Sequence, residues 1–152
     1  MFVYRIEKEK YKDTFPPRGS LFAEGRWNRK GMWVVYTSET VSLAKLEALA
    51  NSGSKLPANR YLTTIEIKEK APIIQINPKN LPADWNQVPF RKSLAQYIQP
   101  VIDSQSYLAV MVPSIHSPNE YNFLLLPDHP QFGKHVQLVG SKPVGFDRRL
   151  KQ

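Results

Sequence analysis

Glu47 and Arg26 are the first residues in this sequence whose types and positions suggest chemistry. Glu47 lies in "VSLAKLEALA" (41–50), where nearly all the rest of the helical circumference is apolar. A helix that is apolar on all sides is buried, and a buried carboxylate needs an ion-pair or hydrogen-bond partner. The arginine of "EGRWN", Arg26, is one candidate. We therefore expect a buried Glu47 beside Arg26, either as a structural ion pair or as part of a functional site.

Three residues of one continuous segment are able to meet in a cleft. Arg26 precedes the apolar run "MWVVYT", Tyr36 lies near the end of that run, and Glu47 follows in the next segment. A loop, a strand and a helix in succession can place these side chains around one cavity. The alternative is an ordinary surface loop in which Trp27 packs inward and the arginines face water.

Ser114 is a further candidate, because it ends the apolar run "VMVPS" and precedes a polar turn that contains Asn119 and Asn122. Its hydroxyl suits ligand binding, and it suits equally well a turn before Pro118. A nucleophilic serine is not expected, because no GxSxG motif surrounds it.

Several other kinds of site are not expected. The chain has no cysteine, and its three histidines lack the i, i+4 spacing of a helical zinc site, so we expect no metal. Neither a GxGxxG nor a GxxxxGK[ST] phosphate loop is present. No run of 18 apolar residues and no signal-peptide pattern occurs, which predicts a cytoplasmic protein without a membrane partner.

The net charge of +8 and the pI of about 9.7 favour an anionic partner, whether a nucleotide, a nucleic acid or an acidic protein. The basic residues are dispersed, and the absence of a basic block disfavours direct nucleic-acid binding. A solvated basic surface without a partner is the simple alternative.

The elements that position these residues are mostly strands. Short runs rich in β-branched and aromatic residues predict strands at 2–6, 32–37, 60–69, 72–76, 107–114, 121–126 and 135–140. A helix is predicted over 40–50, with Ser38 as its cap, and a weaker one over 91–102, which Pro100 ends or kinks. Because regular βαβ alternation is absent, we expect one mixed α/β or α+β domain.

Several motifs follow one another along the chain. They are "YRI" (4–6), "GRWNRKGMWVVYTSETVSLAKLE" (25–47), "LPADW" (81–85), "VPS" (112–114), "YNFLLLPDHPQF" (121–132) and "FDRRL" (146–150). In combination they resemble the RES-domain family, the toxins of RES–Xre toxin–antitoxin pairs. The resemblance covers essentially the whole chain and implies a single RES domain over 1–152. It also implies an ADP-ribosyltransferase-like fold with a central, largely antiparallel split sheet flanked by helices.

The family takes its name from an arginine, a glutamate and a serine, which correspond to Arg26, Glu47 and Ser114. Its members consume NAD⁺, so the resemblance implies NAD⁺ as the substrate and no metal. Glu47 then stabilises the oxocarbenium-like ribose that forms when nicotinamide leaves, and Arg26 and Arg5 contact the pyrophosphate. Nicotinamide leaves readily, so no general acid is required, which suits a site without a suitably placed histidine.

The remaining expected site residues are polar or aromatic. Tyr36 is expected to stack on nicotinamide, and Ser114 to hydrogen-bond the ribose or the carboxamide. Asn28 either orders the loop around Arg26 or touches ligand, and Asn122 completes the NAD⁺-binding set.

These features lead to three hypotheses of different classes. The first is a toxin that cleaves the nicotinamide–ribose bond of NAD⁺, by hydrolysis or phosphorolysis or as an ADP-ribosyltransferase that modifies a host protein. A cognate Xre-type antitoxin would inhibit it by occluding the active site. The second is a basic RNA-binding or ribonuclease toxin. The third is a catalytically silent interaction module of the same fold.

Overall fold

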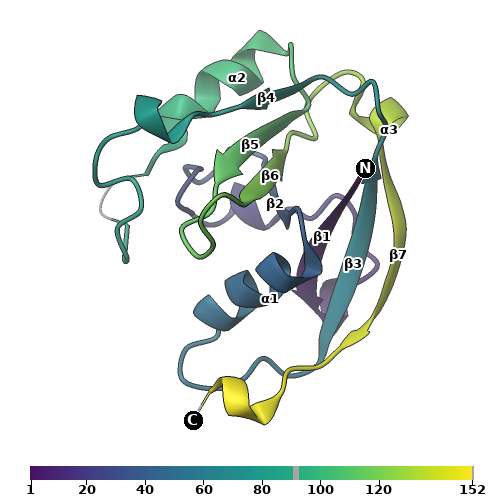
Figure 1. The fold of residues 1–152 in the computed structure, drawn as a ribbon. Helices are drawn as coiled ribbons and strands as arrows, with labels where there is room; N and C mark the ends of the chain where they lie inside the picture. The colour runs from purple at the N-terminus through teal and green to yellow at the C-terminus, as the bar shows by residue number, and fades with distance from the viewer. Residues whose placement is uncertain (91–92, 152) are drawn as a thin grey trace.

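A computed structural model describes residues 1–90 and 93–151 of the chain, and its centre is a seven-stranded sheet (Figure 1). The strands are β1 (Phe2–Lys8), β2 (Val35–Ser38), β3 (Arg60–Ile67), β4 (Ile73–Gln75), β5 (Ala109–Pro113), β6 (Tyr121–Leu125) and β7 (Val136–Val144). All seven predicted strands are confirmed. β2 begins later than expected because Met32 closes a turn onto Arg29 and the Val34 N–H donates to the Ser20 hydroxyl.

The sheet consists of two halves that meet at a narrow seam. Its strand order is β4-β5-β6-β2-β1-β3-β7, and every neighbouring pair is antiparallel except β4 and β5. The two halves join where β1 pairs with β2, and this pairing is limited to Tyr4 and Ser38. The expected split, largely antiparallel sheet corresponds to this arrangement. The seam leaves backbone groups of β1 and β2 available to other partners.

Helix α1 (Val41–Ala50) carries Glu47 and packs against β1 and β2. Its N-cap is Thr40, whose Oγ1 accepts a hydrogen bond from the Leu43 N–H at 3.0 Å, so the predicted cap at Ser38 is wrong. The expectation of a fully buried helix is also wrong. Only Leu43 and Ala44 are buried, because one face of α1 covers the sheet and the other faces solvent.

The predicted second helix is divided into two pieces. Residues 91–92 lie outside the described residues, 95–97 form a 3₁₀ turn, and α2 (Gln99–Ser104) follows. Pro100 lies in the first turn of α2, where its missing N–H costs nothing, so it starts this helix and does not end it. A short α3 (Phe132–His135) leads into β7. Further 3₁₀ turns are Glu9–Tyr11, Gly19–Leu21, Pro78–Asn80 and Arg148–Leu150.

Two hydrophobic clusters hold the sheet. One, which includes Trp27, Ile98 and Leu124, joins the loop before β2 and the region of α2 to the β4–β2 half of the sheet. The other, which includes Val3, Ile65 and Phe123, contains residues from both halves. The two halves of the sheet therefore share few backbone hydrogen bonds at the seam, and hydrophobic packing holds them together.

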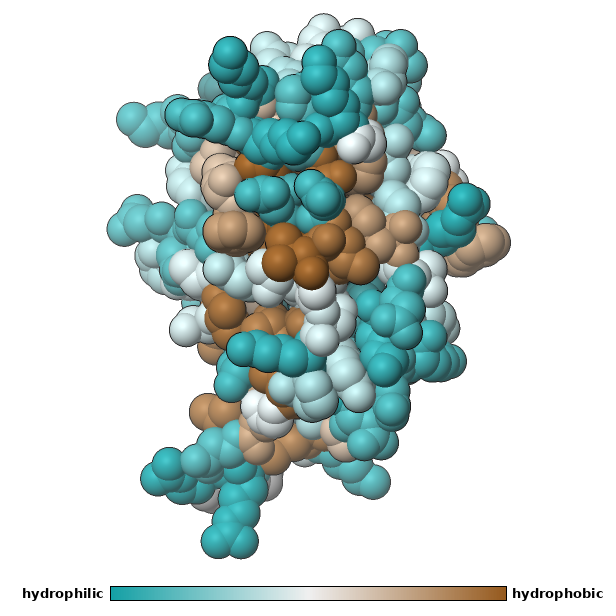
Figure 2. All heavy atoms as spheres, turned by 90° about the vertical axis from the view of Figure 1, so that its right-hand side faces the viewer, coloured by the Kyte–Doolittle hydropathy of each residue, from teal (hydrophilic) through white to brown (hydrophobic). Residues whose placement is uncertain are grey.

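β7 is an edge strand, and its side of the molecule is shown in Figure 2. Apolar surface lies in the middle of this view and hydrophilic residues surround it. Val139 of β7 is 57% exposed, while Lys142 and Pro143 of the same strand are of the types that discourage edge-to-edge pairing.

Candidate active site at the seam of the sheet

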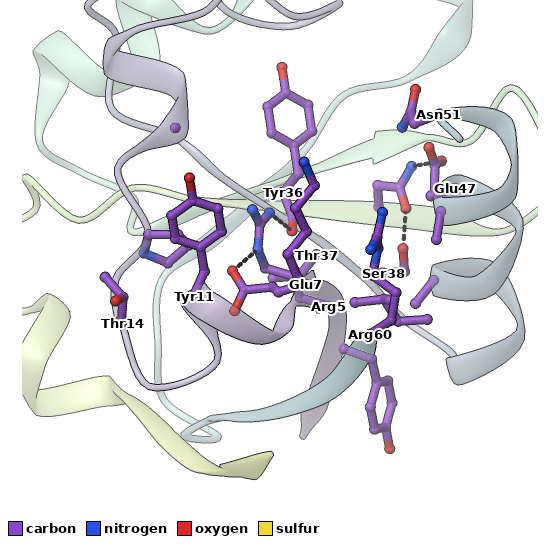
Figure 3. Close-up of a pocket in the computed structure, with 18 of the residues that line it drawn as sticks. Arg5, Glu7, Tyr11, Thr14, Tyr36, Thr37, Ser38, Glu47, Asn51 and Arg60 are labelled. Carbon is purple, nitrogen blue, oxygen red and sulfur yellow. Dashed lines mark hydrogen bonds and ion pairs between the residues drawn. The ribbon is translucent and has the colours of Figure 1, made fainter. Parts of the chain in front are cut away.

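A cavity of about 720 Å³ opens where β1 and β2 diverge. β1, β2 and α1 contribute to its lining, as do the turns before β2 (Figure 3). Of the residues expected in the site, the lining includes Arg5, Tyr36, Glu47 and Asn122. Asn28 lines a smaller neighbouring cavity of about 250 Å³, which shares Arg5 and Tyr36 with the first. Arg26 and Ser114 are not among the lining residues of either cavity.

Glu47 is held from two sides. Its Oε1 accepts a hydrogen bond from Asn122 Nδ2 at 2.7 Å, and Asn122 Oδ1 in turn accepts one from Ser38 Oγ at 2.8 Å (Figure 3). Its Oε2 lies 3.5 Å from Nε2 of His116. A histidine therefore lies close to Glu47, where the sequence reading had expected no suitably placed one. The Glu47 side chain remains 31% exposed, so the carboxylate is fixed in orientation and still open to the cleft.

Arg5 bridges the seam between β1 and β2. Its Nε donates to Glu7 Oε1 at 2.6 Å and its Nη1 donates to the backbone oxygen of Tyr36 at 2.9 Å. The Glu7 side chain is 4% exposed, so this carboxylate needs the arginine. Glu7 was not anticipated from the sequence, although residues i and i+2 of a strand share one face. Two of the five N–H donors of Arg5 are used in these bonds, which leaves donors for an anionic ligand.

Arg26 does not form an ion pair with Glu47, so the structural pair that was one of the two alternatives is absent. Its Nη1 donates to the backbone oxygen of Trp85 at 2.9 Å, and its guanidinium lies 5.7 Å from the centre of the Phe90 ring. Burial lowers the pKa of Arg26, while the negative charge of Glu47 acts in the opposite direction. The direct hydrogen-bond partner of Arg26 is therefore the Trp85 backbone.

Tyr36 and Asn28 hold the loop before β2 in place. The Tyr36 hydroxyl donates to Asn28 Oδ1 at 2.6 Å and accepts from the Trp27 N–H at 3.2 Å. Burial raises the pKa of Tyr36 well above its usual range, so the phenol stays neutral. Asn28 Nδ2 donates to three backbone oxygens, those of Ser20, Ala23 and Arg29. The loop-ordering role considered for Asn28 is therefore present in the structure.

Ser114 adopts the turn-forming role that the sequence left open. Its Oγ accepts hydrogen bonds from the N–H groups of His116 at 3.0 Å and Ser117 at 3.2 Å. It is 8% exposed, and its hydroxyl stabilises the turn between β5 and β6.

The cavity also contains basic and aromatic residues that sequence reasoning missed. Lys8, Arg18 and Arg60 add positive charge to its lining, and Tyr11 adds a ring. Lys8 and Arg60 are direct neighbours in the β1–β3 pairing. They were missed because a strand pairing between distant segments is not visible in local sequence patterns. Such a basic cavity suits a ligand with negative charge on one part and apolar or aromatic groups on another.

The residues from 1–90 and 93–151 contain no group of three or more His, Cys, Asp or Glu side chains arranged to hold a metal ion. Within the same residues, no helix is long and apolar enough to cross a membrane.

Comparisons with known proteins agree on one family. The RES domain family model matches residues 2–147. "Toxin Res" of Yersinia enterocolitica (serotype O:8 / biotype 1B) is 33% identical over 153 residues, which cover 99% of this chain and 100% of the relative. "Prs ADP-ribosylating toxin" of Sphingobium sp. is 35% identical over 142 residues, covering 91% of this chain and 87% of the relative.

Among solved structures, the M. tuberculosis MbcT–MbcA toxin–antitoxin complex contains a similar chain. The TM-score is 0.68 at 18% identity, with 98% of this chain and 85% of that chain covered. At this identity the likeness concerns the fold alone, which this chain and the solved one share over nearly the whole of this chain.

Proposed function

The chain belongs to the RES domain family, whose relatives described above are toxins, and from this premise we propose that it is a toxin that cleaves the nicotinamide–ribose bond of NAD⁺. The observation that carries this proposal is the Glu47 carboxylate. It is fixed by Asn122 at 2.7 Å and faces a basic cavity of about 720 Å³. This volume lies within the usual range of small-molecule sites.

In the proposed reaction, Glu47 stabilises the positive charge that develops on the ribose as nicotinamide leaves. A carboxylate that is oriented before the reaction can oppose this charge without reorganising, which is where electrostatic catalysis is most effective. The hydrogen bond from Asn122 and the link to Ser38 supply that orientation. The bonding electrons leave with nicotinamide, which is neutral once released.

The pyrophosphate is assigned to Arg5, with Arg26 contributing long-range positive charge. Arg5 lines the cavity and keeps N–H donors free, whereas Arg26 donates to Trp85. A planar guanidinium matches phosphate oxygens better than an ammonium group does. Tyr36 is assigned to the nicotinamide ring, since it lines both cavities. In this proposal Ser114 acts through the turn that it stabilises.

A second reaction uses the same cleft. The relative from Sphingobium sp. is named an ADP-ribosylating toxin, and it is 35% identical to this chain. Transfer of ADP-ribose to a protein differs from NAD⁺ degradation only in the acceptor that attacks the ribose. Both reactions require Glu47, so this residue does not separate them.

The test is incubation of the purified protein with NAD⁺, alone, with inorganic phosphate and with cell extract, followed by identification of the products. Free ADP-ribose indicates hydrolysis, ADP-ribose 1-phosphate indicates phosphorolysis, and labelled protein in the extract indicates transfer. Nicotinamide must appear in each case. If no nicotinamide is released while the protein binds and cleaves RNA independently of Glu47, the proposal is wrong and the ribonuclease hypothesis replaces it.

We also propose that an antitoxin protein of the Xre type covers the cleft. A structurally similar chain was solved within a toxin–antitoxin complex, and the cavity lining contains Arg5, Lys8, Arg18 and Arg60, which suit an anionic segment. Co-expression with the products of neighbouring genes should abolish nicotinamide release. Unchanged release with all of them would contradict the proposal.

A further inference from the structure

His116 lies in a turn that is closed by hydrogen bonds among its own residues. The turn joins β5 to β6, and Ser114 Oγ accepts the N–H of His116 at 3.0 Å. The Ser114 N–H donates to the backbone oxygen of Glu120 at 3.0 Å. The Ser117 hydroxyl donates to the Glu120 carboxylate, which closes the turn. The backbone that carries the imidazole is therefore held before any ligand arrives.

The imidazole of His116 faces Glu47. Its Nε2 is 3.5 Å from Glu47 Oε2, while the other carboxylate oxygen is occupied by Asn122. The remaining acids around the turn have other partners. Glu39 accepts from the Tyr121 N–H at 2.7 Å, and Glu120 accepts from the Thr40 and Ser117 hydroxyls. Across the described ranges, Glu47 is the acid within ion-pair distance of His116.

Both side chains are reachable from solvent. The His116 side chain is 25% exposed and that of Glu47 is 31% exposed. A structural histidine would be buried and satisfied, as many core histidines are. This one instead lies beside the carboxylate that the proposed function places next to the reacting ribose.

We propose that His116 is the catalytic base that takes the proton of the acceptor. This role rests on the proposed function. As nicotinamide departs with its bonding electrons, the oxygen of a water molecule or of a protein hydroxyl forms a bond to the ribose carbon. The acceptor proton moves to Nε2 of neutral His116, and the imidazolium formed faces Glu47 at ion-pair distance. Release of that proton to solvent restores the starting state.

The proposal restricts the class of acceptor. Water and hydroxyl groups carry a proton that must go to a base, whereas inorganic phosphate already has a negatively charged oxygen to attack with. His116 is therefore needed when the acceptor is an O–H group and dispensable when it is phosphate. Ser114 is a positioning residue in this scheme, because it acts only by holding the His116 backbone.

The experiment compares the parent protein, His116→Ala and, as a control for loss of a histidine that does not face Glu47, His129→Gln. NAD⁺ is supplied with water alone and with inorganic phosphate, and products are quantified from pH 5 to 8, the range in which histidine charge changes. The parent rate with water should rise with pH. His116→Ala should lose roughly 10²-fold or more of that rate and its pH dependence, and added imidazole should restore part of it. His129→Gln should match the parent.

The outcomes are separable. A His116→Ala protein that melts like the parent, hydrolyses NAD⁺ at the parent rate and keeps the parent pH profile overturns the role of His116 and leaves the proposed function intact. An equal loss with water and phosphate, without rescue by imidazole, also overturns it, because it indicates a structural role. If the parent releases no nicotinamide with any acceptor, the proposed function falls first and this inference falls with it.

Discussion

Glu47 keeps its orientation because each of its two carboxylate oxygens has a partner of its own. Asn122 donates to Oε1 without removing the negative charge, and His116 faces Oε2. A charge fixed in this way is useful for catalysis only if the reaction develops positive charge nearby. The role of Glu47 is therefore tested by a substitution that removes the negative charge of its side chain and keeps the shape.

Glu47→Gln should reduce nicotinamide release by roughly 10²–10³-fold, the usual loss when one preorganised electrostatic contact is removed. The amide oxygen can still accept from Asn122, so melting temperature and NAD⁺ affinity should change little. Release rates, binding isotherms and melting curves check this. Glu69→Gln, on the exposed surface after β3, is the control and should match the parent in all three. A Glu47→Gln protein with near-parent release would remove Glu47 from the mechanism.

Tyr36 gives a second residue-scale prediction, which concerns pH. Burial raises the pKa of its phenol above the ordinary value of 10.0, so the unfolded chain loses this proton at lower pH than the folded protein does. The stability contributed by this shift is complete below about pH 10 and is lost as pH rises further. Tyr36→Phe should be less stable at neutral pH by about 1 kcal/mol, because the bond to Asn28 is lost. Its stability should nevertheless decline less steeply above pH 10 in urea unfolding experiments, and an equally steep decline would contradict the prediction.

At the scale of elements, α1 is tied to the turn that bears His116. Thr40 caps the helix through Leu43 and its hydroxyl donates to Glu120 Oε1 at 3.3 Å. The two elements that place Glu47 and His116 therefore share one side chain.

Thr40→Ala should lower the free energy of unfolding by about 1 kcal/mol, the typical loss of an N-cap. For a chain of this length that corresponds to a fall in melting temperature of roughly 2–4 °C. Thr40→Ser keeps the capping oxygen and is the matched control. Both variants are measured by thermal unfolding under the same conditions. An alanine variant as stable as the serine variant would show that the cap contributes nothing.

The elements themselves were largely predictable, whereas their environment was not. Strands such as Arg60–Ile67 were predicted from the alternation of apolar and polar residues and from β-branched side chains, which are local properties of the sequence. The burial expected for Glu47 was wrong because an apolar residue can lie on the outer face of α1, as Leu46 does with 41% of its surface exposed. The Arg5–Glu7 pair and the approach of His116 to Glu47 depend on which segments meet in three dimensions. Pairing between distant segments carries no local signal, so the candidate site was identified only in part.

A ligand should stabilise the whole molecule most when it binds at the seam between the two halves of the sheet. The two halves of the sheet meet at one register position, and the cavity lies beside it with residues from β1 on one side and β2 on the other. Arg5 already connects the halves through Tyr36. A dinucleotide bound in this cavity would add contacts to both halves at once.

NAD⁺ should therefore stabilise the whole fold, and the Glu47→Gln protein allows this to be measured because it leaves the ligand intact. At a concentration of 100 times Kd, binding adds about 2.7 kcal/mol to the free energy of unfolding, or roughly 5–10 °C in melting temperature. Hydrogen exchange should slow in β1 and β2 together, because both strands line the cavity. Adenosine, which lacks the pyrophosphate, is the control ligand and should shift the melting temperature much less. Adding Arg5→Gln to the Glu47→Gln protein should reduce the shift in melting temperature that NAD⁺ produces. Protection confined to β2 would mean that the ligand does not bridge the seam, and the assignment of the pyrophosphate to Arg5 would then be wrong.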